Sequence, residues 1–365
     1  MPQVELGVPR PRAARASEDA RTDRPADPRL LDRYGRVAQD LRVSLTDRCN
    51  LRCEYCMPPE GFEWLPGSDV LSDAEVVRLV TVAVERLGVR EVRFTGGEPL
   101  LRKGLESIIA ATSALRTAEG RAPETSLTTN GLGLDRRVAG LAAAGLTRIN
   151  VSLDSLDRQT YATLARRDRL PDVLAALDAA EAAGLRPVKI NAVLMRGRNE
   201  HEAPDLLDFA LRRGFQLRFI EQMPLGPPDS WERGGMVTAA EILGSLRDRF
   251  ALAPADPAER GAAPAQRWHV APEGDRPGGT VGIIASVTEP FCGACDRTRL
   301  TADGQVRTCL FSRTETDLRA LVRSGAPDAE VAETWRAAMW GKLPGHGIDD
   351  PGFLQPQRPM SAIGG

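Results

Sequence analysis

The chain alternates between short apolar segments and longer amphipathic segments from about residue 40 onward, and this alternation limits its fold more than any other feature. Residues 41–45 alternate in polarity as a half-buried strand does. A capping box at Ser72 and Glu75 begins the first helix, and Gly88 ends it. We expect strands at 41–45, 91–94, 125–129, 148–153, 187–194 and 216–221, and helices at 72–87, 104–116, 135–144, 171–183 and 202–213.

The order of these elements predicts how the strands pair. Each strand is followed by a helix, which indicates parallel pairing with right-handed crossovers. The strands are nearly continuous apolar runs, as in a sheet that is covered on both faces. About six βα units are fewer than the eight of a closed barrel, so we predict an α/β fold, a partial (open) parallel βα barrel. A doubly wound sheet stays an alternative, because the sequence does not show curvature.

The regions outside this alternation differ in composition. Residues 1–36 contain eight Arg, six acidic residues and five Pro with almost no apolar periodicity, which predicts a disordered arm. We place the barrel at 37–250 and a smaller C-terminal α+β layer at 251–365. Within that layer, residues 254–279 are rich in Ala, Pro and Gly and predict an exposed, partly flexible insertion. The expected elements of the layer are strands at 281–287 and 305–311 and helices at 314–323 and 328–340.

Charge and hydropathy exclude some classes of function. The 365 residues carry 48 Lys and Arg against 50 Asp and Glu, so the net charge gives no support to nucleic-acid binding. The sequence contains no run of about 18 uncharged apolar residues and no apolar segment typical of a secretory signal. We therefore expect a cytoplasmic protein with neither a nucleic acid nor a membrane as its partner.

The six cysteines fall into two groups of three, which favours two metal sites over a disulfide scaffold. Cys49, Cys53 and Cys56 form a C-x3-C-x2-C loop directly after the first predicted strand, at the edge where barrel active sites gather. Three thiolates can bind three irons of a [4Fe–4S] cluster and leave the fourth iron open. Structural zinc sites require four ligands, and no His lies near this loop. Zinc ligands or small buried side chains stay alternatives.

The second group, Cys292, Cys295 and Cys309, has the spacing C-x2-C-x13-C and again lacks a fourth thiolate. It predicts either a second [4Fe–4S] cluster with an open iron or a zinc site completed by His269 or His346. Arg297 and Arg299 alternate on an extended segment beside it, so both side chains point to the same side. Two guanidinium groups there suit a phosphate chain. A solvated Arg pair is the alternative.

Polar residues also end the predicted strands. Gly96 and Gly97 follow the second strand and let the backbone approach a ligand closely. Polar residues also occur in four segments at the ends of later strands: 128–131, 152–154, 189–191 and 221–224. So many polar strand ends are not explained by the residue preferences of turns alone. Lys189 lies inside a strand, where an unpaired buried ammonium costs several kcal/mol. We expect it to face an anionic ligand at the barrel mouth.

These motifs are similar to the motifs of a known superfamily and of one family within it. The C-x3-C-x2-C loop on this fold resembles the radical S-adenosylmethionine superfamily. Together with R-F-T-G-G-E-P at 93–99 and C-G-x-C-x-R-x-R-L at 292–300, it is similar to the GTP 3′,8-cyclase family of molybdenum cofactor biosynthesis, over about residues 38–365. The final Gly364 and Gly365 match that family's double-glycine tail, which reaches toward the active site. The sequence has no Walker motif, so ordinary GTP hydrolysis is not supported.

The resemblance implies two [4Fe–4S] clusters, one on each cysteine group, and S-adenosylmethionine as cofactors. A 5′-deoxyadenosyl radical would abstract the ribose 3′ hydrogen of GTP, and the carbon radical would add to C8, with no side chain acting as acid or base. The open iron of the second cluster would bind the guanine, and Glu98 would accept from the methionine ammonium. The implied S-adenosylmethionine contacts are Tyr55, Gly97, Ser152 and Met223, and the implied GTP contacts are Arg42, Arg93, Thr128, Lys189, Arg297, Thr298 and Arg299.

The resemblance also implies partners. These are a reductant protein such as flavodoxin or ferredoxin and, as product acceptor, cyclic pyranopterin monophosphate synthase. We expect a monomer or a homodimer. Two other functions stay open: another radical S-adenosylmethionine enzyme with an auxiliary cluster, or a non-catalytic, zinc-stabilised nucleotide-binding protein.

Overall fold

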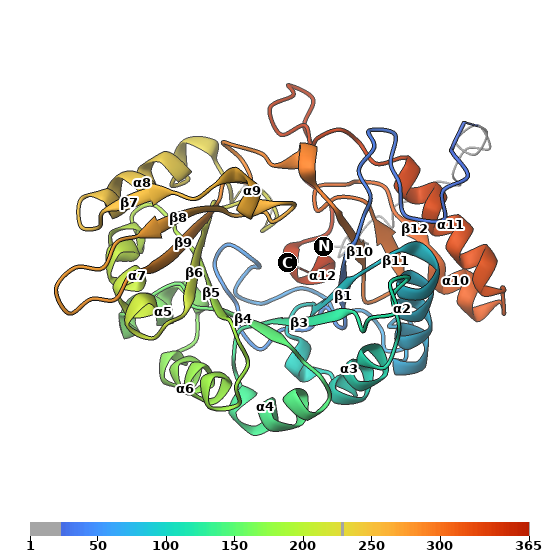
Figure 1. Cartoon of the computed structure of the whole chain (residues 1–365), viewed down its shortest axis with the longest axis horizontal. Helices are drawn as coiled ribbons and strands as arrows, with labels where there is room; N and C mark the ends of the chain where they lie inside the picture. Colours follow the sequence, from blue (N-terminus) through green and yellow to red (C-terminus); the bar gives the residue numbers. More distant parts are fainter. Residues whose placement is uncertain (1–22, 228–229, 365) are drawn as a thin grey trace, which may run out of the picture.

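One curved sheet dominates the computed structural model, which describes residues 23–227 and 230–364 (Figure 1). Its strands lie in the order β12-β11-β10-β1-β2-β3-β4-β5-β6-β9-β8-β7. Neighbouring strands from β10 through β9 pair in parallel, and helices pack around the outside of the curve. The two edge strands, β12 and β7, are not paired with each other, so the barrel is open. The predicted partial βα barrel is confirmed.

The parallel strands place alternate residues inside the barrel and against the outer helices. In β1, for example, Leu41 and Val43 are buried in the hydrophobic core between sheet and helices, whereas Arg42 lies on the other face. The parallel strands are β1 (Asp40–Ser44), β2 (Glu91–Thr95), β3 (Glu124–Thr129), β4 (Arg148–Ser152), β5 (Val188–Val193), β6 (Gln216–Ile220), β9 (Gly279–Ile284) and β10 (Arg297–Leu300).

The helices of the barrel begin and end close to where the sequence predicts. The Ser72 hydroxyl accepts from the Glu75 N–H, the Glu75 carboxylate accepts from the Ser72 N–H, and Gly88 ends the helix in the left-handed conformation. The barrel helices are α2 (Asp73–Leu87), α3 (Leu105–Ser113), α4 (Leu134–Ala143), α6 (Leu170–Ala182), α7 (Ala203–Arg212) and α8 (Ala239–Arg247), and the short 3-10 turns are η1 (Pro99–Leu101), η2 (Glu200–Glu202), η3 (Arg233–Gly235) and η4 (Cys292–Ala294). Among the described residues, no helix is long and apolar enough to cross a membrane.

Two helices of the barrel region, α5 (Arg158–Ala165) and α8, are absent from the sequence prediction. Helix α5 begins at Asp157, whose carboxylate accepts from the Thr160 N–H, and it buries Tyr161 and Leu164. It is only eight residues long, too short to show the periodicity that reveals the other helices. It packs against the first cysteine loop, as described below.

The sequence predicts a smaller C-terminal layer packed on the barrel, and the structure shows that the strands of this region are continuous with the barrel sheet. Strand β9 pairs with β6, and β10 pairs with β1, so C-terminal strands extend both edges of the barrel sheet. Two antiparallel strands, β11 (Gln305–Arg307) and β12 (Thr316–Asp317), continue the sheet beyond β10. Helices α10 (Leu318–Arg323), α11 (Asp328–Trp340) and α12 (Met360–Ile363) complete the region.

The segment 254–279 also differs from the predicted flexible insertion. It contains β8 (Gln266–Val270) and α9 (Pro257–Arg260), and β8 pairs in antiparallel fashion with β9 and with β7 (Leu252–Pro254). Trp268 and Val270 alternate along β8 and are buried in the main core. This two-residue alternation is the strand signal that the surrounding Ala, Pro and Gly obscure.

The arm predicted over 1–36 is partly packed. Residues 1–22 lie outside the described residues. Leu30 is fully buried, and its backbone N–H donates to the Leu87 carbonyl at the end of α2. The Trp340 indole donates to the Asp23 carboxylate, and Arg24 pairs with Glu333 of α11. Buried Leu30 and polar contacts scattered along the segment, with no apolar periodicity, therefore hold residues 23–36 on the barrel.

Candidate active site

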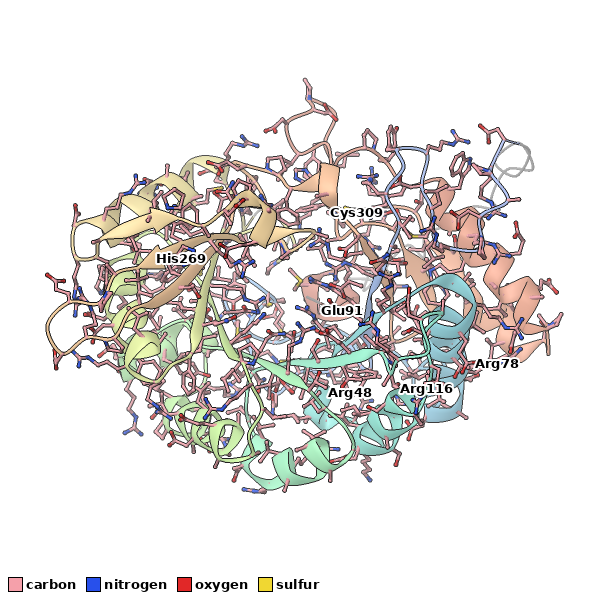
Figure 2. The ribbon with its side chains drawn as sticks, in the orientation of Figure 1. Arg48, Arg78, Glu91, Arg116, His269 and Cys309 are labelled. Carbon is pink, nitrogen blue, oxygen red and sulfur yellow. The ribbon has the colours of Figure 1, made fainter. Side chains whose placement is uncertain are left out.

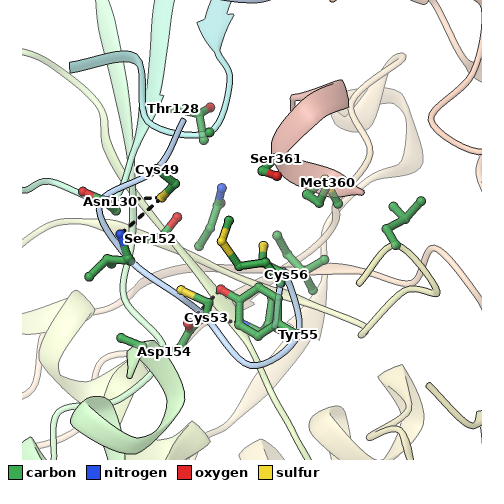
Figure 3. Close-up of a pocket in the computed structure, with 18 of the residues that line it drawn as sticks. Cys49, Cys53, Tyr55, Cys56, Thr128, Asn130, Ser152, Asp154, Met360 and Ser361 are labelled. Carbon is green, nitrogen blue, oxygen red and sulfur yellow. Dashed lines mark hydrogen bonds between the residues drawn. The ribbon is translucent and has the colours of Figure 1, made fainter. Parts of the chain in front are cut away.

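A cavity opens at the carboxyl ends of the barrel strands, where parallel barrels place their active sites (Figure 3). All three cysteines of the first group border it. The residues assigned to S-adenosylmethionine border it as well: Tyr55, Gly97, Ser152 and Met223. Of the residues assigned to GTP, only Thr128 does so. The cavity is also lined by Asn130, Asp154, Asn191, Glu221, Gln222, Met360 and Ser361.

Helix α5 holds the first cysteine loop in place. The backbone N–H groups of Arg52 and Glu54 donate to the last carbonyls of α5, those of Ala165 and Leu164, at 3.2 and 2.9 Å. Arg166 follows α5 with a positive φ of 52°, and its guanidinium donates to the Met57 carbonyl at 2.8 Å. The loop is therefore fixed by main-chain contacts that do not use its thiols.

The thiols of Cys49, Cys53 and Cys56 are free and suit an iron–sulfur cluster. Burial raises the pKa of the Cys49 thiol to about 11, and it also raises the pKa values of Cys53 and Cys56. Such thiols bind as thiolates only when a cationic group offsets their charge. Within the described residues, no three Cys, His or acidic side chains converge on a point that a single metal ion could occupy. Three thiols on one cavity wall fit a group with several irons better than a lone zinc ion.

Two glycines bring the end of β2 against this loop. A Cβ on Gly97 would lie 2.3 Å from the Arg48 carbonyl oxygen, and one on Gly96 would lie 2.4 Å from the Thr46 carbonyl oxygen. Gly96 also has a φ of 146°. No larger residue fits at either position. The predicted close backbone approach is thus present, and it joins β2 to the cysteine loop at the cavity.

The structure gives Glu98 a different place from the one expected. Glu98 is fully buried and does not line the cavity. Its carboxylate accepts from the Thr129 hydroxyl, the Asn130 N–H and the Leu100 N–H at 2.7, 2.7 and 2.9 Å. Burial raises the pKa of this carboxyl to about 7. Its oxygens are already bonded within the protein, so Glu98 joins the ends of β2 and β3 instead of facing a ligand ammonium.

Asp154 is the main cavity residue to which the sequence analysis gave no role. Its carboxylate accepts from the Tyr55 hydroxyl at 2.9 Å and from the Val193 N–H at 2.8 Å (Figure 3). Burial raises its pKa to about 6. Asp154 thus links the cysteine loop to the ends of β4 and β5. Its position two residues after Ser152, at a strand end, was the available signal.

A cluster of buried cations lies on the inner face of the barrel. Arg42 stands directly opposite Arg93 on β2 and Arg299 on β10 in the strand register. Asp40 is the nearest acid, with Oδ2 at 3.7 Å from Arg42 Nε and 3.9 Å from Arg93 Nη2. Burial and the charge of Arg93 lower the pKa of Arg42 well below its usual range. Buried side-chain nitrogens of Arg42, Arg93, Arg218 and Arg297 have no hydrogen-bond partner among the described residues.

Lys189 and Arg218 continue this basic cluster across the barrel. Burial and the positive charges of Arg218 and Arg148 lower the pKa of Lys189 to about 8. Burial and the charge of Arg93 lower that of Arg218 to about 9. Arg218 donates to the Asn150 side chain, which in turn donates to the Thr128 hydroxyl. Arg218 was missed because one Arg in an apolar strand resembles a surface residue. We call Arg42, Arg93, Lys189, Arg218, Arg297 and Arg299 the basic cluster.

Thr298 does not belong to the basic cluster through its side chain. Its hydroxyl accepts from the Trp335 indole of α11 at 3.0 Å and is fully buried. Successive residues of a strand point to opposite faces, so Thr298 faces α11 while Arg297 and Arg299 face the barrel interior.

The second cysteine group lies beside the basic cluster. Cys292 begins the η4 turn, Cys295 follows its last residue, and Cys309 follows β11. Burial acts to raise the pKa of the Cys295 thiol, but the positive charges of Arg297 and Lys342 outweigh it and lower the pKa to about 6. Cys292 and Cys309 are close enough for their charges to interact. The three free thiols therefore form a second donor set in positively charged surroundings, which suits an anionic cluster.

Neither candidate for a fourth zinc ligand is available. The His346 ring contacts the Ser286 carbonyl through Nε2 at 2.9 Å and accepts from the Ile348 N–H through Nδ1 at 3.1 Å. His269 lies on β8, away from Cys309 (Figure 2), and its nearest ionic partner is Glu259 at 3.6 Å. Both histidines thus have other partners, and neither supplies the fourth ligand that a zinc site at Cys292, Cys295 and Cys309 would require.

The C-terminal tail enters the barrel, as the double-glycine motif predicts (Figure 1). Arg299 donates to the Gly364 carbonyl, and Met360 and Ser361 of α12 line the cavity. A Cβ on Gly364 would lie 2.7 Å from Thr95 Cγ2. Gly365 lies outside the described residues.

Comparison with known proteins identifies the family. A model of the Radical SAM superfamily matches residues 43–210, and a Molybdenum Cofactor Synthesis C model matches residues 215–348. A GTP 3′,8-cyclase of Corynebacterium glutamicum is 64% identical over 337 residues, which are 92% of this chain and 89% of that protein. One of Mycolicibacterium smegmatis is 59% identical over 368 residues and the full length of both chains. The chain belongs to the GTP 3′,8-cyclase family.

As a member of this family, the chain is a radical S-adenosylmethionine enzyme with iron–sulfur clusters. The match at 215–348 begins before β6, so it includes elements that the sequence analysis placed in the barrel. Among solved structures, Streptococcus suis SuiB bound to precursor peptide SuiA shares the fold, with a TM-score of 0.56 at 14% identity. That likeness covers 83% of this chain and 66% of SuiB, so the chain spans about two thirds of the solved protein.

Proposed function

We propose that this chain converts GTP to (8S)-3′,8-cyclo-7,8-dihydroguanosine 5′-triphosphate, the first step of molybdenum cofactor biosynthesis. The observation that carries the proposal is the basic cluster, because four of its six cations, Arg42, Arg93, Arg297 and Arg299, share one acid, Asp40, as a near neighbour. Buried cations without counter-charges are costly unless an anion completes the site. A triphosphate brings three to four negative charges and bidentate acceptors for the guanidinium groups.

The first cysteine group would hold the first [4Fe–4S] cluster, with Tyr55, Gly97, Ser152 and Met223 around S-adenosylmethionine. When bound, this pair supplies the 5′-deoxyadenosyl radical. The chain's own part is to place and seal the site. The Tyr55–Asp154 hydrogen bond fixes the cysteine loop, Glu98 fixes the ends of β2 and β3, and the apolar walls exclude water from a reactive species.

For GTP, we propose that Arg42, Arg93, Lys189, Arg297 and Arg299 bind the triphosphate and that Thr128 contacts the nucleotide from the cavity wall. Thr298 contributes no side-chain contact, since its hydroxyl binds Trp335. Cys292, Cys295 and Cys309 would hold the second [4Fe–4S] cluster, whose open iron would bind the guanine. No side chain is required as acid or base. The basic cluster orients the nucleotide between the two cysteine groups.

We further propose a cytoplasmic location, a flavodoxin or ferredoxin as electron donor, and cyclic pyranopterin monophosphate synthase as product acceptor. The chain would act as a monomer or homodimer. The first cluster has to be reduced, which requires an electron donor. The product is reactive, which favours its transfer to an acceptor enzyme. Pull-down and turnover with each purified partner would test them one by one.

The deciding experiment is anaerobic incubation of the reconstituted enzyme with GTP, S-adenosylmethionine and dithionite, followed by mass spectrometry. We expect 5′-deoxyadenosine and the cyclised nucleotide in equal amounts, and neither in a matched incubation with the Cys49→Ser variant. Formation of 5′-deoxyadenosine without the cyclised nucleotide would indicate a different radical reaction. Two zinc ions per chain without sulfide or 5′-deoxyadenosine would indicate a non-catalytic zinc protein.

A further inference from the structure

Lys342 is a buried ammonium that the proposed reaction does not use. It follows the C-terminus of α11, and only 4% of its surface is exposed. Helix α11 is fixed against β10 by the bond between Trp335 and Thr298, so the position of Lys342 is set by the packing of the fold. Its backbone N–H donates to the Met339 carbonyl at 3.0 Å.

The three hydrogen bonds of the Lys342 ammonium are all directed at the second cysteine loop. It donates to the Arg297 carbonyl at 2.9 Å, to the Cys295 carbonyl at 3.2 Å and to the Cys295 Sγ at 3.3 Å. Among the described residues, the acceptors of this ammonium include no carboxylate. A buried ammonium without a counter-charge costs several kcal/mol. Of its three acceptors, only the Cys295 sulfur becomes negatively charged when it binds iron.

A second cation holds the other end of the same turn. Arg36 donates to the Cys292 carbonyl at 2.7 Å and to the carbonyls of Pro344 and Leu343 at 2.9 and 2.6 Å. It therefore ties the segment that carries Lys342 to Cys292. On this loop Arg36 contacts carbonyl groups, and its charge is paired with the Asp32 carboxylate, whereas Lys342 contacts a sulfur. The two cations thus hold the loop together, but only one acts on a cluster ligand.

We propose that Lys342 is a positioning residue of the second cluster, which orients Cys295 and sets the reduction potential of the cluster by a charge-assisted hydrogen bond to its sulfur. Reduction potentials of iron–sulfur clusters depend on net charge and on hydrogen bonds to the ligand sulfurs. Reduction adds one negative charge, and a nearby cation stabilises the reduced form more than the oxidised one. Lys342 therefore raises the potential. The inference rests on the cluster assigned to Cys292, Cys295 and Cys309 but not on the GTP reaction.

The test is an anaerobic redox titration of the reconstituted full chain, followed by electron paramagnetic resonance. A background in which Cys49, Cys53 and Cys56 are replaced by Ser isolates the signal of the second cluster, and the titration is repeated in the intact enzyme. We expect Lys342→Met to change the ratio of oxidised to reduced cluster about tenfold at a fixed potential, a downward shift of about 59 mV for one electron. Lys342→Arg, which keeps the charge, should retain most of the original potential.

Lys103→Met is the matched control, because Lys103 is exposed and lies between η1 and α3, away from this loop. It should leave the potential unchanged. An unchanged potential in Lys342→Met, with full iron content, would overturn the proposal. If Lys342→Met loses the cluster, Lys342→Gln is compared with Lys342→Arg: a lower potential, or a cluster retained only in the Arg variant, supports the role of the charge, and loss from all three variants overturns it.

The outcomes for Lys342 and for the proposed function are separate. A second cluster whose potential shifts, in an enzyme that makes no cyclised nucleotide, would support Lys342 and contradict the GTP reaction. A wild-type chain without a second cluster would overturn both the cluster assignment and the inference.

Discussion

Arg42 of β1 and Arg93 of β2 are direct register partners in a parallel pair, so both guanidinium groups enter the barrel from the same side. The nearest carboxylate, that of Asp40, lies 3.7 and 3.9 Å from them, too far for a hydrogen bond to either. Like charges held together in a buried place reduce the stability of the unliganded fold. A polyanionic substrate removes that repulsion, so stability and substrate binding are coupled.

Replacing Arg93 with Gln should therefore have opposite effects on stability and on binding. We expect the free energy of unfolding of the unliganded variant to rise by about 1 kcal/mol, because the repulsion between the two guanidinium groups is relieved. The variant should therefore unfold at a higher temperature. GTP binding should weaken by about 1.5–3 kcal/mol, the usual worth of a charge-assisted hydrogen bond. Calorimetric unfolding without nucleotide and titration with GTP measure the two effects. Arg116→Gln, at an exposed position whose guanidinium contacts only nearby carbonyls, is the control. A parallel loss of stability and affinity would contradict the coupling.

The sequence predicted best what depends on neighbours along the chain. The capping box of α2, the strand order from β1 to β6 and the first cysteine loop after β1 are local patterns, and each is confirmed in position. Tyr55, Gly97, Ser152 and Met223 also line one cavity as the resemblance implied. These residues follow strand ends, and parallel strands bring their carboxyl ends together whatever the details of packing.

The sequence could not show contacts that form only after folding. Nothing near Thr298 indicates that its hydroxyl accepts a hydrogen bond from the indole of Trp335, which is 37 residues away. Nothing near His346 indicates that the carbonyl of Ser286, 60 residues away, contacts its ring. The pairing of β9 with β6 is likewise non-local, so the sequence did not show that the C-terminal strands extend the barrel sheet. Helix α5 was missed for its shortness, although it fixes the first cysteine loop.

Iron content separates the two cysteine groups. The wild-type chain should bind about eight irons with matching sulfide, and Cys49→Ser and Cys292→Ser should each retain about four. Only Cys49→Ser should abolish 5′-deoxyadenosine formation completely, because the first group lies in the cavity with Tyr55 and Gly97. Iron and sulfide analysis after anaerobic purification, with product assay, measures both. Equal loss of 5′-deoxyadenosine in the two variants would argue against separate roles.

The raised pKa of Glu98, about 7 against an ordinary 4.5, predicts a pH dependence of stability. The folded chain binds this proton more tightly than the unfolded chain, so the contribution to stability is present at low pH and is lost as pH rises through 7. Between pH 8 and pH 5.5, the wild type should gain about 2 kcal/mol relative to Glu98→Gln. Anaerobic calorimetry at several pH values measures the difference. Glu60→Gln, at an exposed position, should show no such trend. A difference that is constant with pH would mean that Glu98 stays ionised when buried.

The tail position predicts a sharp difference between two glycines near the C-terminus. Gly364 has a φ of 83°, and an Ala Cβ there would lie 2.7 Å from Thr95 Cγ2. Gly364→Ala should push the tail out of the barrel and break its contact with Arg299, which then loses its orientation toward the substrate. Cyclised product should form at least about tenfold more slowly, since misplacement of binding groups by about 1 Å is that costly, while iron content stays unchanged. Gly352→Ala is the matched control, because a Cβ at Gly352 meets no atom within 4 Å. Turnover of Gly364→Ala at the wild-type rate would show that the docked tail is not needed for the reaction.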